Sequence, residues 1–245
     1  MTPWLPTPLS MLPVQEALRV TKYDGKSAID RPRYSPAAAA RHLRLPVSTV
    51  RWWTLGNGPH LPAISIAEPH QQLLSFRNLV EIHVLSSVMC QDRERIPLAP
   101  VRTAVAQLAE HLGSVHPLAD GRMPHEGKDL LAARLATLTN ATQFGEAAIA
   151  SILACYLKRV RRDERGEPLC LLLFTRARPD GPEHIMIDPA VQAGQPCVTG
   201  TQVTTALLCS RFRGGESALE LAEAIHCEPE AIEEALRYEM PGPTA

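Results

Sequence analysis

The stretch from Tyr34 to Gly56, YSPAAAARHLRLPVSTVRWWTLG, predicts two short helices joined by a tight turn. Ser35 is expected to cap the first helix, because its hydroxyl can accept a hydrogen bond from a first-turn N–H. Pro36 suits the first helical position, where a missing N–H costs nothing. Pro46 is expected to break this helix, and Ser48 is expected to cap the next one.

The second helix has one apolar and one polar face. Val50 and Trp53 lie three residues apart, so we expect them to share the buried face. This layout is typical of a DNA-reading helix-turn-helix, and the alternative is an ordinary helical hairpin with a solvated face. The expected DNA contacts, on the outward face and near the turn, are Ser48, Thr49, Arg51, Trp52, Arg41 and Arg44.

The residues that follow predict a wing and two further helices. Two short β-leaning runs, Leu61–Ala67 and Leu73–Phe76, could form the strands of a wing. An apolar stripe at helical spacing begins at Ser75. Another helix is expected to begin near Pro97 and to end at Gly113.

This order resembles the DNA-binding domain of the mercury-resistance-regulator (MerR) family over about residues 34–112. The resemblance implies a winged helix-turn-helix that binds DNA. The residues that carry it are Tyr34, Ser35, Ala39, Ala40, Leu43, Ser48, Thr49, Val50, Arg51, Trp53 and Gly56.

A second signature begins at Ile185 with IMIDPAVQAGQPCVTGTQVT. Its turn residues predict a β-hairpin, and the helix signals after it predict a compact three-helix unit with a helix-turn-helix-like order. Thr201 is expected to cap the first of these helices, and Ser217 with Glu220 forms a capping box for the second. Glu228 and Pro229 begin the last helix. The glycines expected at positive φ or at a close approach are Gly194, Gly200 and Gly215.

This C-terminal stretch resembles the antitoxin-associated domain-of-unknown-function family 433 over about residues 184–239. Gln202 stands where that family usually has arginine. The matching residues are Ile187, Asp188, Pro189, Gly194, Pro196, Gly200, Thr201, Gly215, Ser217, Glu220, Leu221, Ala222 and Tyr238.

Together the two signatures resemble VapB-type antitoxins. The resemblance implies a type II toxin-antitoxin protein that blocks a PIN-domain ribonuclease toxin and represses its own operon. Because one helix-turn-helix reads only a half-site, we expect a homodimer on a palindromic operator. The alternative is a ligand-sensing MerR-like one-component regulator without a toxin partner.

The composition and the motifs of the chain argue against several classes of protein. The 245 residues carry a net charge of −1, which argues against a generally basic nucleic-acid binder. The six cysteines form no C-x-x-C pair, so no zinc site is expected. We also expect no cofactor. Without a nucleophile elbow, phosphate loop or HExxH motif, we expect no enzyme. The lack of an apolar run of about 18 residues and of a signal peptide predicts a cytoplasmic protein.

We therefore expect a mostly α-helical chain with small β-hairpins and four segments. Residues 1–33 are a Pro-rich arm, which is either disordered or orders on the toxin. Residues 34–112 are the DNA-binding domain, residues 113–183 a helical connector with a strand, and residues 184–245 the antitoxin-type domain.

Within the connector we expect a loop over residues 123–129 and helices over 129–138 and 144–160. A strand over 168–175 is expected to pair with 184–187 across the Pro179-Asp180-Gly181 turn. The second helix would end in a basic cluster that either contacts phosphates or lies solvated at the helix terminus. This cluster comprises Lys158, Arg159, Arg161 and Arg162.

Overall fold

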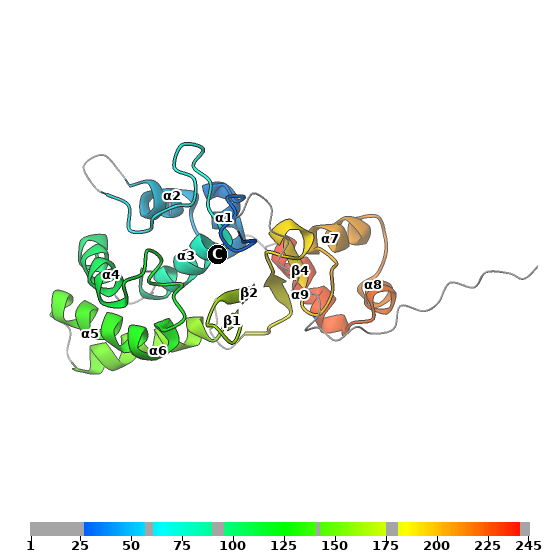
Figure 1. Ribbon diagram of the computed structural model, residues 1–245. Coiled ribbons are helices and arrows are strands. Elements are labelled where there is room, and N and C mark those ends of the chain that lie inside the picture. Colours follow the sequence, from blue (N-terminus) through cyan, green and yellow to red (C-terminus); the bar gives the residue numbers. More distant parts are fainter. Residues whose placement is uncertain (1–26, 57–60, 90–95, 141–142, 175–180, 241–245) are drawn as a thin grey trace, which may run out of the picture.

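The computed structural model describes residues 27–56, 61–89, 96–140, 143–174 and 181–240. These residues form nine α-helices and one four-stranded antiparallel sheet, which confirms the mostly α fold class. Helices α1 to α6 lie on one side of the molecule and α7 to α9 on the other, with the sheet between them (Figure 1). In chain order the α-helices are α1 (Pro36–Leu43), α2 (Val47–Leu55), α3 (Phe76–Met89), α4 (Leu98–Leu112), α5 (Lys128–Thr139), α6 (Gln143–Leu157), α7 (Thr205–Arg213), α8 (Ala218–Ile225) and α9 (Pro229–Glu239).

The sheet joins the connector to the C-terminal unit, because the pairing expected between residues 168–175 and 184–187 crosses from one segment to the other. Its strands follow the order β1-β2-β3-β4, and Leu171 of β2 pairs with Ile187 of β3, which confirms the expected strand pairing. Of the predicted turn between them, positions 179 and 180 lie outside the described residues. The strands are β1 (Val160–Arg162), β2 (Pro168–Leu172), β3 (Ile185–Ile187) and β4 (Pro196–Val198).

The turn between α1 and α2 differs in detail from the expectation. Ser35 accepts a hydrogen bond from the N–H of Ala38, as predicted. The first helix ends at Leu43 because Arg44 adopts the left-handed conformation, with φ 54° and ψ 42°. Pro46, and not Ser48, is the N-cap of α2, so the predicted serine cap is wrong.

The two wing strands do not form. Between Leu61 and Phe76 the described backbone makes only isolated bridges, Glu68 with Leu73 and Tyr34 with Leu74. The N–H groups of Ala63 and Ile64 donate instead to the carbonyl of Trp53 at the end of α2.

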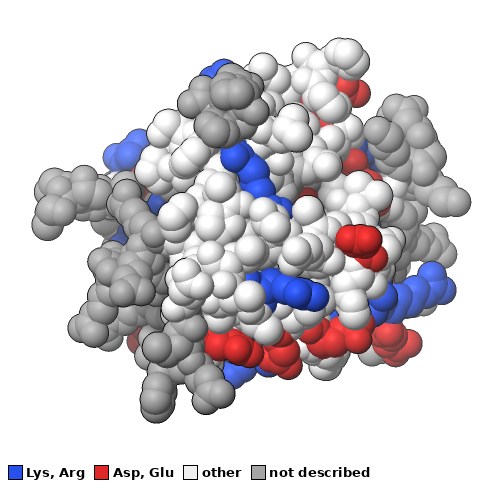
Figure 2. Space-filling model, turned by 90° about the vertical axis from the view of Figure 1, so that its left-hand side faces the viewer, with Lys and Arg blue, Asp and Glu red and all other residues white. Residues whose placement is uncertain are grey.

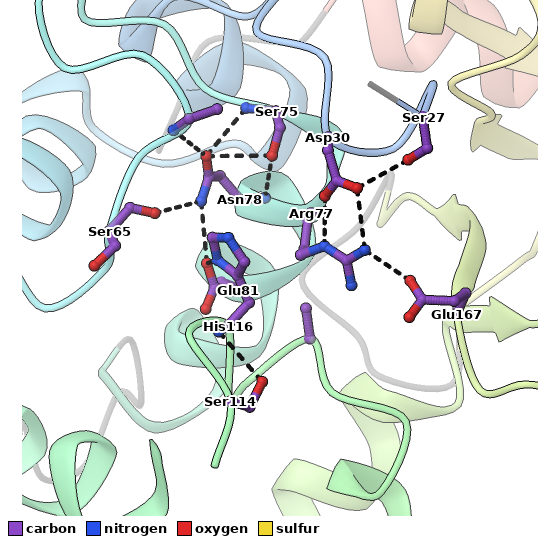
Figure 3. A network of polar contacts seen from close by, with 12 residues as sticks. Ser27, Asp30, Ser65, Ser75, Arg77, Asn78, Glu81, Ser114, His116 and Glu167 are labelled. Atoms are coloured by element: carbon purple, nitrogen blue, oxygen red, sulfur yellow. Dashed lines mark hydrogen bonds and ion pairs between the residues drawn. The ribbon is translucent and has the colours of Figure 1, made fainter. Parts of the chain in front are cut away.

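In place of strand pairing, the side chain of one buried asparagine of α3 forms hydrogen bonds with the backbone of this segment (Figure 3). Oδ1 of Asn78 accepts hydrogen bonds from the N–H groups of Ala67 and Ser75, both at 3.1 Å. Its Nδ2 donates to the carbonyl of Ser65 at 2.8 Å and to Oε2 of Glu81 at 3.1 Å. The segment before α3 is therefore held by a side chain, because its backbone groups have found partners outside a sheet.

The connector also corrects the prediction. The expected loop contains a π-helical turn, Met123–Gly127, which is interrupted at His125, whose φ of −104° and ψ of −105° are not helical. The predicted α5 is confirmed, whereas α6 ends at Leu157 and the chain then enters strand β1. Of the basic cluster, Lys158 follows the last residue of α6 and is exposed, as the solvated-terminus interpretation expects, whereas Arg161 and Arg162 lie in β1.

Two arginines of that cluster bind backbone carbonyls within the fold. Arg159 is buried and donates to the carbonyls of Gly181 and of Pro182, the latter at 2.9 Å. Nη1 of Arg162 donates to the carbonyls of Ala119 and Gly166, at 2.7 and 2.8 Å. These two guanidinium groups tie loops together, so both interpretations of the cluster are wrong for them.

The C-terminal unit largely follows its signals. The N-cap of α7 is Thr204 and not Thr201, because the latter sits in the turn before the helix. The capping box of Ser217 and Glu220 is confirmed at α8. The three predicted glycines do adopt positive φ, at 74° for Gly194, 79° for Gly200 and 105° for Gly215.

The last part of the Pro-rich arm packs on the fold. Asp30 forms an ion pair with Arg77 of α3 at 2.7 Å, and Ile29 packs against the hydrophobic core. Arg77 also pairs with Glu167, as Figure 3 shows, so it joins the arm to the turn between β1 and β2. Residues 1–26 lie outside the described part of the chain.

Candidate nucleic-acid interface

The outward face of α2 presents the residues predicted to contact DNA. Val50 and Trp53 are 0% and 1% exposed, so the predicted buried face is confirmed. Ser48, Arg51 and Trp52 are exposed at intervals of three and four residues, which places them on one side of the helix. Thr49 is only partly exposed, so it contributes less surface to that face.

This face lies on an acid-free stretch of the chain. Residues 31–67 contain no aspartate or glutamate and five arginines, namely Arg31, Arg33, Arg41, Arg44 and Arg51. Arg41 and Arg51 are exposed and make no hydrogen bond or ion pair with the described residues. Their guanidinium groups are therefore available to a ligand with phosphate oxygens.

Arg102 of α4 adds a cation that the sequence did not reveal. Its guanidinium carbon lies 6.0 Å from the ring centroid of Trp52, within the range of a cation–π contact. Its Nε and Nη2 atoms are buried without a hydrogen-bond partner among the described residues. No local signal could have found this pair, since α4 follows α2 by some forty residues and only the fold brings them together.

Arg44 faces the C-terminal unit and not the outward face of α2. Its Nη2 donates to the carbonyl of Tyr238 at 2.9 Å and to that of Arg237 at 3.3 Å. The guanidinium carbon also lies 5.1 Å from the centroid of the Tyr238 ring. Arg44 thus satisfies carbonyls at the end of α9, where a cation also suits the helix dipole.

The neighbouring His42 makes a second contact to the same tyrosine. Its Nδ1 lies 3.2 Å from the hydroxyl of Tyr238, and both side chains are buried. Burial, with a smaller effect of Arg41, lowers the pKa of His42 to about 4. The imidazole is therefore neutral at pH 7, and burial also raises the pKa of the Tyr238 hydroxyl.

The start of the first signature meets the C-terminal unit as well. The hydroxyl of Tyr34 donates to the carbonyl of Gly194, and Nη1 of Arg33 donates to the carbonyl of Pro189 at 2.8 Å. Together with His42 and Arg44, these contacts hold the α1–α2 pair against the C-terminal unit.

The surface on the side of α4 and α5 is mostly uncharged. Figure 2 shows this side, where the blue groups are set apart and most red groups lie along the lower edge, with a few more on the right and at the upper right.

No group of His, Cys, Asp or Glu in the described residues has an arrangement that could hold a metal ion. Burial raises the pKa of the Cys170 and Cys197 thiols to about 11, so neither is a thiolate at pH 7. The described helices include none with the length and hydropathy needed to cross a membrane.

Known proteins resemble this chain in sequence, in fold and in one domain. The chain is 25% identical over 228 residues to the uncharacterized protein Rv2308 of Mycobacterium tuberculosis (strain ATCC 25618 / H37Rv), covering 86% of this chain and 92% of that protein. The X-ray crystal structure of Rv2018 from Mycobacterium tuberculosis matches with a TM-score of 0.67 and 21% identity, over 85% of this chain and 99% of that one. The latter likeness shows the fold alone. Residues 185–238 match the family described as protein of unknown function (DUF433), which confirms the resemblance predicted for the C-terminal unit.

Proposed function

We propose that this chain is a DNA-binding antitoxin that represses its own operon and neutralises a PIN-domain ribonuclease toxin. The observation that carries the DNA-binding part is the exposed Ser48, Arg51 and Trp52 face of α2 on an acid-free stretch of chain. The antitoxin part rests on the resemblance of the two signatures to VapB-type antitoxins, together with the family match of residues 185–238.

In this proposal α2 enters the major groove of the operator. Arg51 reads a base edge or a phosphate, Ser48 and Thr49 add hydrogen bonds, and Arg41 contacts the backbone from the end of α1. Trp52, supported by Arg102, contributes apolar area beside Arg51. Arg44 keeps its contacts to α9 and acts by fixing the orientation of α2. A homodimer places two copies of α2 in successive half-sites of a palindrome.

The DNA-binding part is tested by a gel shift with the promoter of the chain's own operon. We expect a specific shift that resists competitor DNA and weakens with salt, because phosphate contacts release counterions. An equal affinity for the promoter and for a shuffled sequence would contradict operator recognition.

The antitoxin part is tested by co-expression. The gene beside the one for this chain should encode a PIN-domain nuclease whose expression stops growth. We expect the full-length chain to restore growth, and purified chain and nuclease to co-elute. Failure of both outcomes would remove the toxin from the proposal and leave the DNA-binding part.

The second candidate is a ligand-sensing regulator. It is favoured by an open hollow of about 310 Å³ between α5 and α6, lined by Asp129, Ala132, Glu146, Ala147 and Ala150. A small molecule that co-purifies with the chain and changes its operator affinity would support this candidate over the antitoxin.

A further inference from the structure

Two pairs of helices in this chain have the same local construction. The first pair is α1 with α2, and the last pair is α8 with α9. Helices α1 and α8 each have eight residues and each follow a serine N-cap, Ser35 or Ser217, whose hydroxyl accepts a hydrogen bond from an N–H of the first turn. Both end in a left-handed C-cap, with φ 54° at Arg44 and φ 54° at His226.

The second helix of each pair begins at the same spacing. Two residues after the left-handed C-cap comes an N-cap with extended backbone, Pro46 in the first pair and Glu228 in the last. The buried positions then correspond as well. Val50 and Ile232, each four residues after its N-cap, are both 0% exposed. The two pairs can therefore be compared position by position.

At the exposed positions the last pair carries glutamate where the first pair carries arginine or serine. Arg41, Ser48 and Arg51 of the first pair are exposed. The corresponding positions in the last pair are also exposed, and all three are glutamates, namely Glu223, Glu230 and Glu233.

The residues around these three glutamates are also mostly acidic. Residues 214–240 contain a single arginine, Arg237, and no lysine. That arginine is paired with Glu234 of the same helix. The glutamates of this stretch are Glu216, Glu220, Glu223, Glu228, Glu230, Glu233, Glu234 and Glu239. On the exposed face, Glu223, Glu230 and Glu233 repel phosphates at the positions where the first pair would attract them.

We propose that the last helical pair is a protein-docking surface that binds the cationic, phosphate-binding face of the nuclease and that excludes DNA. The identity of the nuclease rests on the proposed function, whereas the exclusion of DNA does not. A nuclease must attract RNA phosphates, so its substrate face is cationic and complementary to this glutamate surface. Leu219 of α8 is 64% exposed and lies one helical turn from Glu223, which supplies an apolar anchor beside the charges.

The experiment compares two charge-reversed variants of the full-length chain. The docking variant carries Glu223→Arg, Glu230→Arg and Glu233→Arg. The control variant carries Glu110→Arg, Glu126→Arg and Glu164→Arg, which are exposed glutamates outside the last pair and give the same change in net charge. The probes are the purified nuclease encoded by the adjacent gene and a duplex DNA of random sequence.

We expect the docking variant to bind the nuclease at least about tenfold more weakly than the wild type, and the control variant to stay within about twofold. We also expect the docking variant to bind random DNA more tightly than the control, with a salt dependence steeper by up to about three phosphate contacts.

Each possible outcome tests one part of the proposal. If the nuclease binds both variants equally, the docking surface is elsewhere, although the antitoxin function stands. If the nuclease does not bind the wild type at all, the toxin part of the proposed function and the docking partner are both wrong. If the docking variant binds random DNA no better than the control, the exclusion of DNA by charge is wrong. Should circular dichroism show that the docking variant is unfolded, the three Glu→Gln substitutions replace it, with the same direction expected.

Discussion

The hydroxyl of Tyr34 donates a hydrogen bond of 3.1 Å to the carbonyl of Gly194, a residue 160 positions later. Both residues are buried, and each belongs to one of the two sequence signatures. Gly194 adopts φ +74°, and a Cβ built on it would lie 2.0 Å from the Tyr34 hydroxyl oxygen. The glycine of the C-terminal signature is therefore required partly because the tyrosine of the N-terminal signature packs on it.

Gly194→Ala should destabilise the fold more than Gly200→Ala. Both glycines have positive φ, which costs an alanine about 1–2 kcal/mol, but nothing lies within 4 Å of a Cβ at Gly200. We expect urea unfolding to show a loss of about 1–2 kcal/mol for Gly200→Ala and a clearly larger loss for Gly194→Ala.

The same clash predicts a coupling between the two residues. Tyr34→Phe removes the atom at 2.0 Å and leaves Cζ as the nearest atom of that ring, at 3.0 Å. Gly194→Ala should therefore cost less in the Tyr34→Phe background than in the wild type. Tyr34→Phe alone should cost about 1–3 kcal/mol through the lost hydrogen bond. If the losses in unfolding free energy of the two single variants add up strictly to that of the double variant, the two side chains do not meet as described.

Arg51→Ala should weaken operator binding by about 1–3 kcal/mol without changing stability, because this exposed side chain has no partner among the described residues. Arg134→Ala, an exposed arginine of α5, is the matched control and should leave the affinity unchanged. Trp53→Ala should show the reverse pattern, a loss of about 3–5 kcal/mol of stability, since Trp53 is 1% exposed. A folded Arg51→Ala protein with full operator affinity would remove α2 as the reading helix.

The sequence predicted the elements that local chemistry determines. Helix caps such as Ser35 and Ser217, the apolar spacing of Val50 and Trp53, and the glycines at positive φ all depend on near neighbours in the chain. It failed where a distant group supplies the partner. The wing was misjudged because Asn78 binds the backbone that a strand would have bound.

Among the candidate DNA contacts, Arg44 should be a stability residue and Arg41 should not. Arg44 donates to two carbonyls at the end of α9 and stacks on Tyr238, so Arg44→Ala should lower stability by about 1.5–3 kcal/mol. Arg44→Lys should recover little of this, because an ammonium lacks the planar fork. Arg41→Ala should weaken DNA binding with unchanged thermal unfolding. A loss of stability in Arg41→Ala equal to that in Arg44→Ala would contradict this division.

The same region shows which part of a site a sequence can and cannot reveal. The outward order of Ser48, Arg51 and Trp52 follows from helix periodicity alone. The diversion of Arg44 to α9 and the approach of Arg102 to Trp52 follow from packing between segments far apart in the chain, for which a single sequence carries no signal.

Stability should fall as the pH drops from about 6.5 to about 4. Burial lowers the pKa of His42 and of His83 to about 4 in the folded chain, against 6.5 for a free histidine. The unfolded chain therefore binds more protons in this window, so the stabilisation is complete above pH 6.5 and is lost as the pH falls toward 4. Each histidine contributes a slope of up to about 1.4 kcal/mol per pH unit.

A comparison of the wild type with His42→Gln isolates the contribution of His42 to the pH dependence of stability. Other groups also contribute to that dependence. Burial raises the pKa of Glu81, for example, so Glu81 changes stability with pH in the opposite sense. Urea unfolding at pH 4.5, 5.5, 6.5 and 7.5, spanning about the window between the two pKa values, should give a shallower pH dependence for the variant. Parallel curves for the two proteins would show that His42 is protonated equally in both states.

Finally, the fragment 34–112 should not fold as the full chain does, although the first signature lies entirely within it. His42 and Tyr34 of this fragment are buried against Tyr238 and Gly194, and α3 is covered by α6, so cutting at 112 exposes buried apolar and polar groups together. The buried hydrophobic residues of all these parts form one cluster, which predicts a single cooperative transition for the full chain.

We expect the fragment to unfold without a sigmoidal transition by circular dichroism and to bind a hydrophobic dye, since packing of the amphipathic faces supplies most helix stability. Adding the fragment 113–245 should restore a cooperative transition if the two pieces reassemble through these contacts. A fragment 34–112 that melts cooperatively alone, at the temperature of the full chain, would show that the contacts to α6 and α9 contribute nothing to its stability.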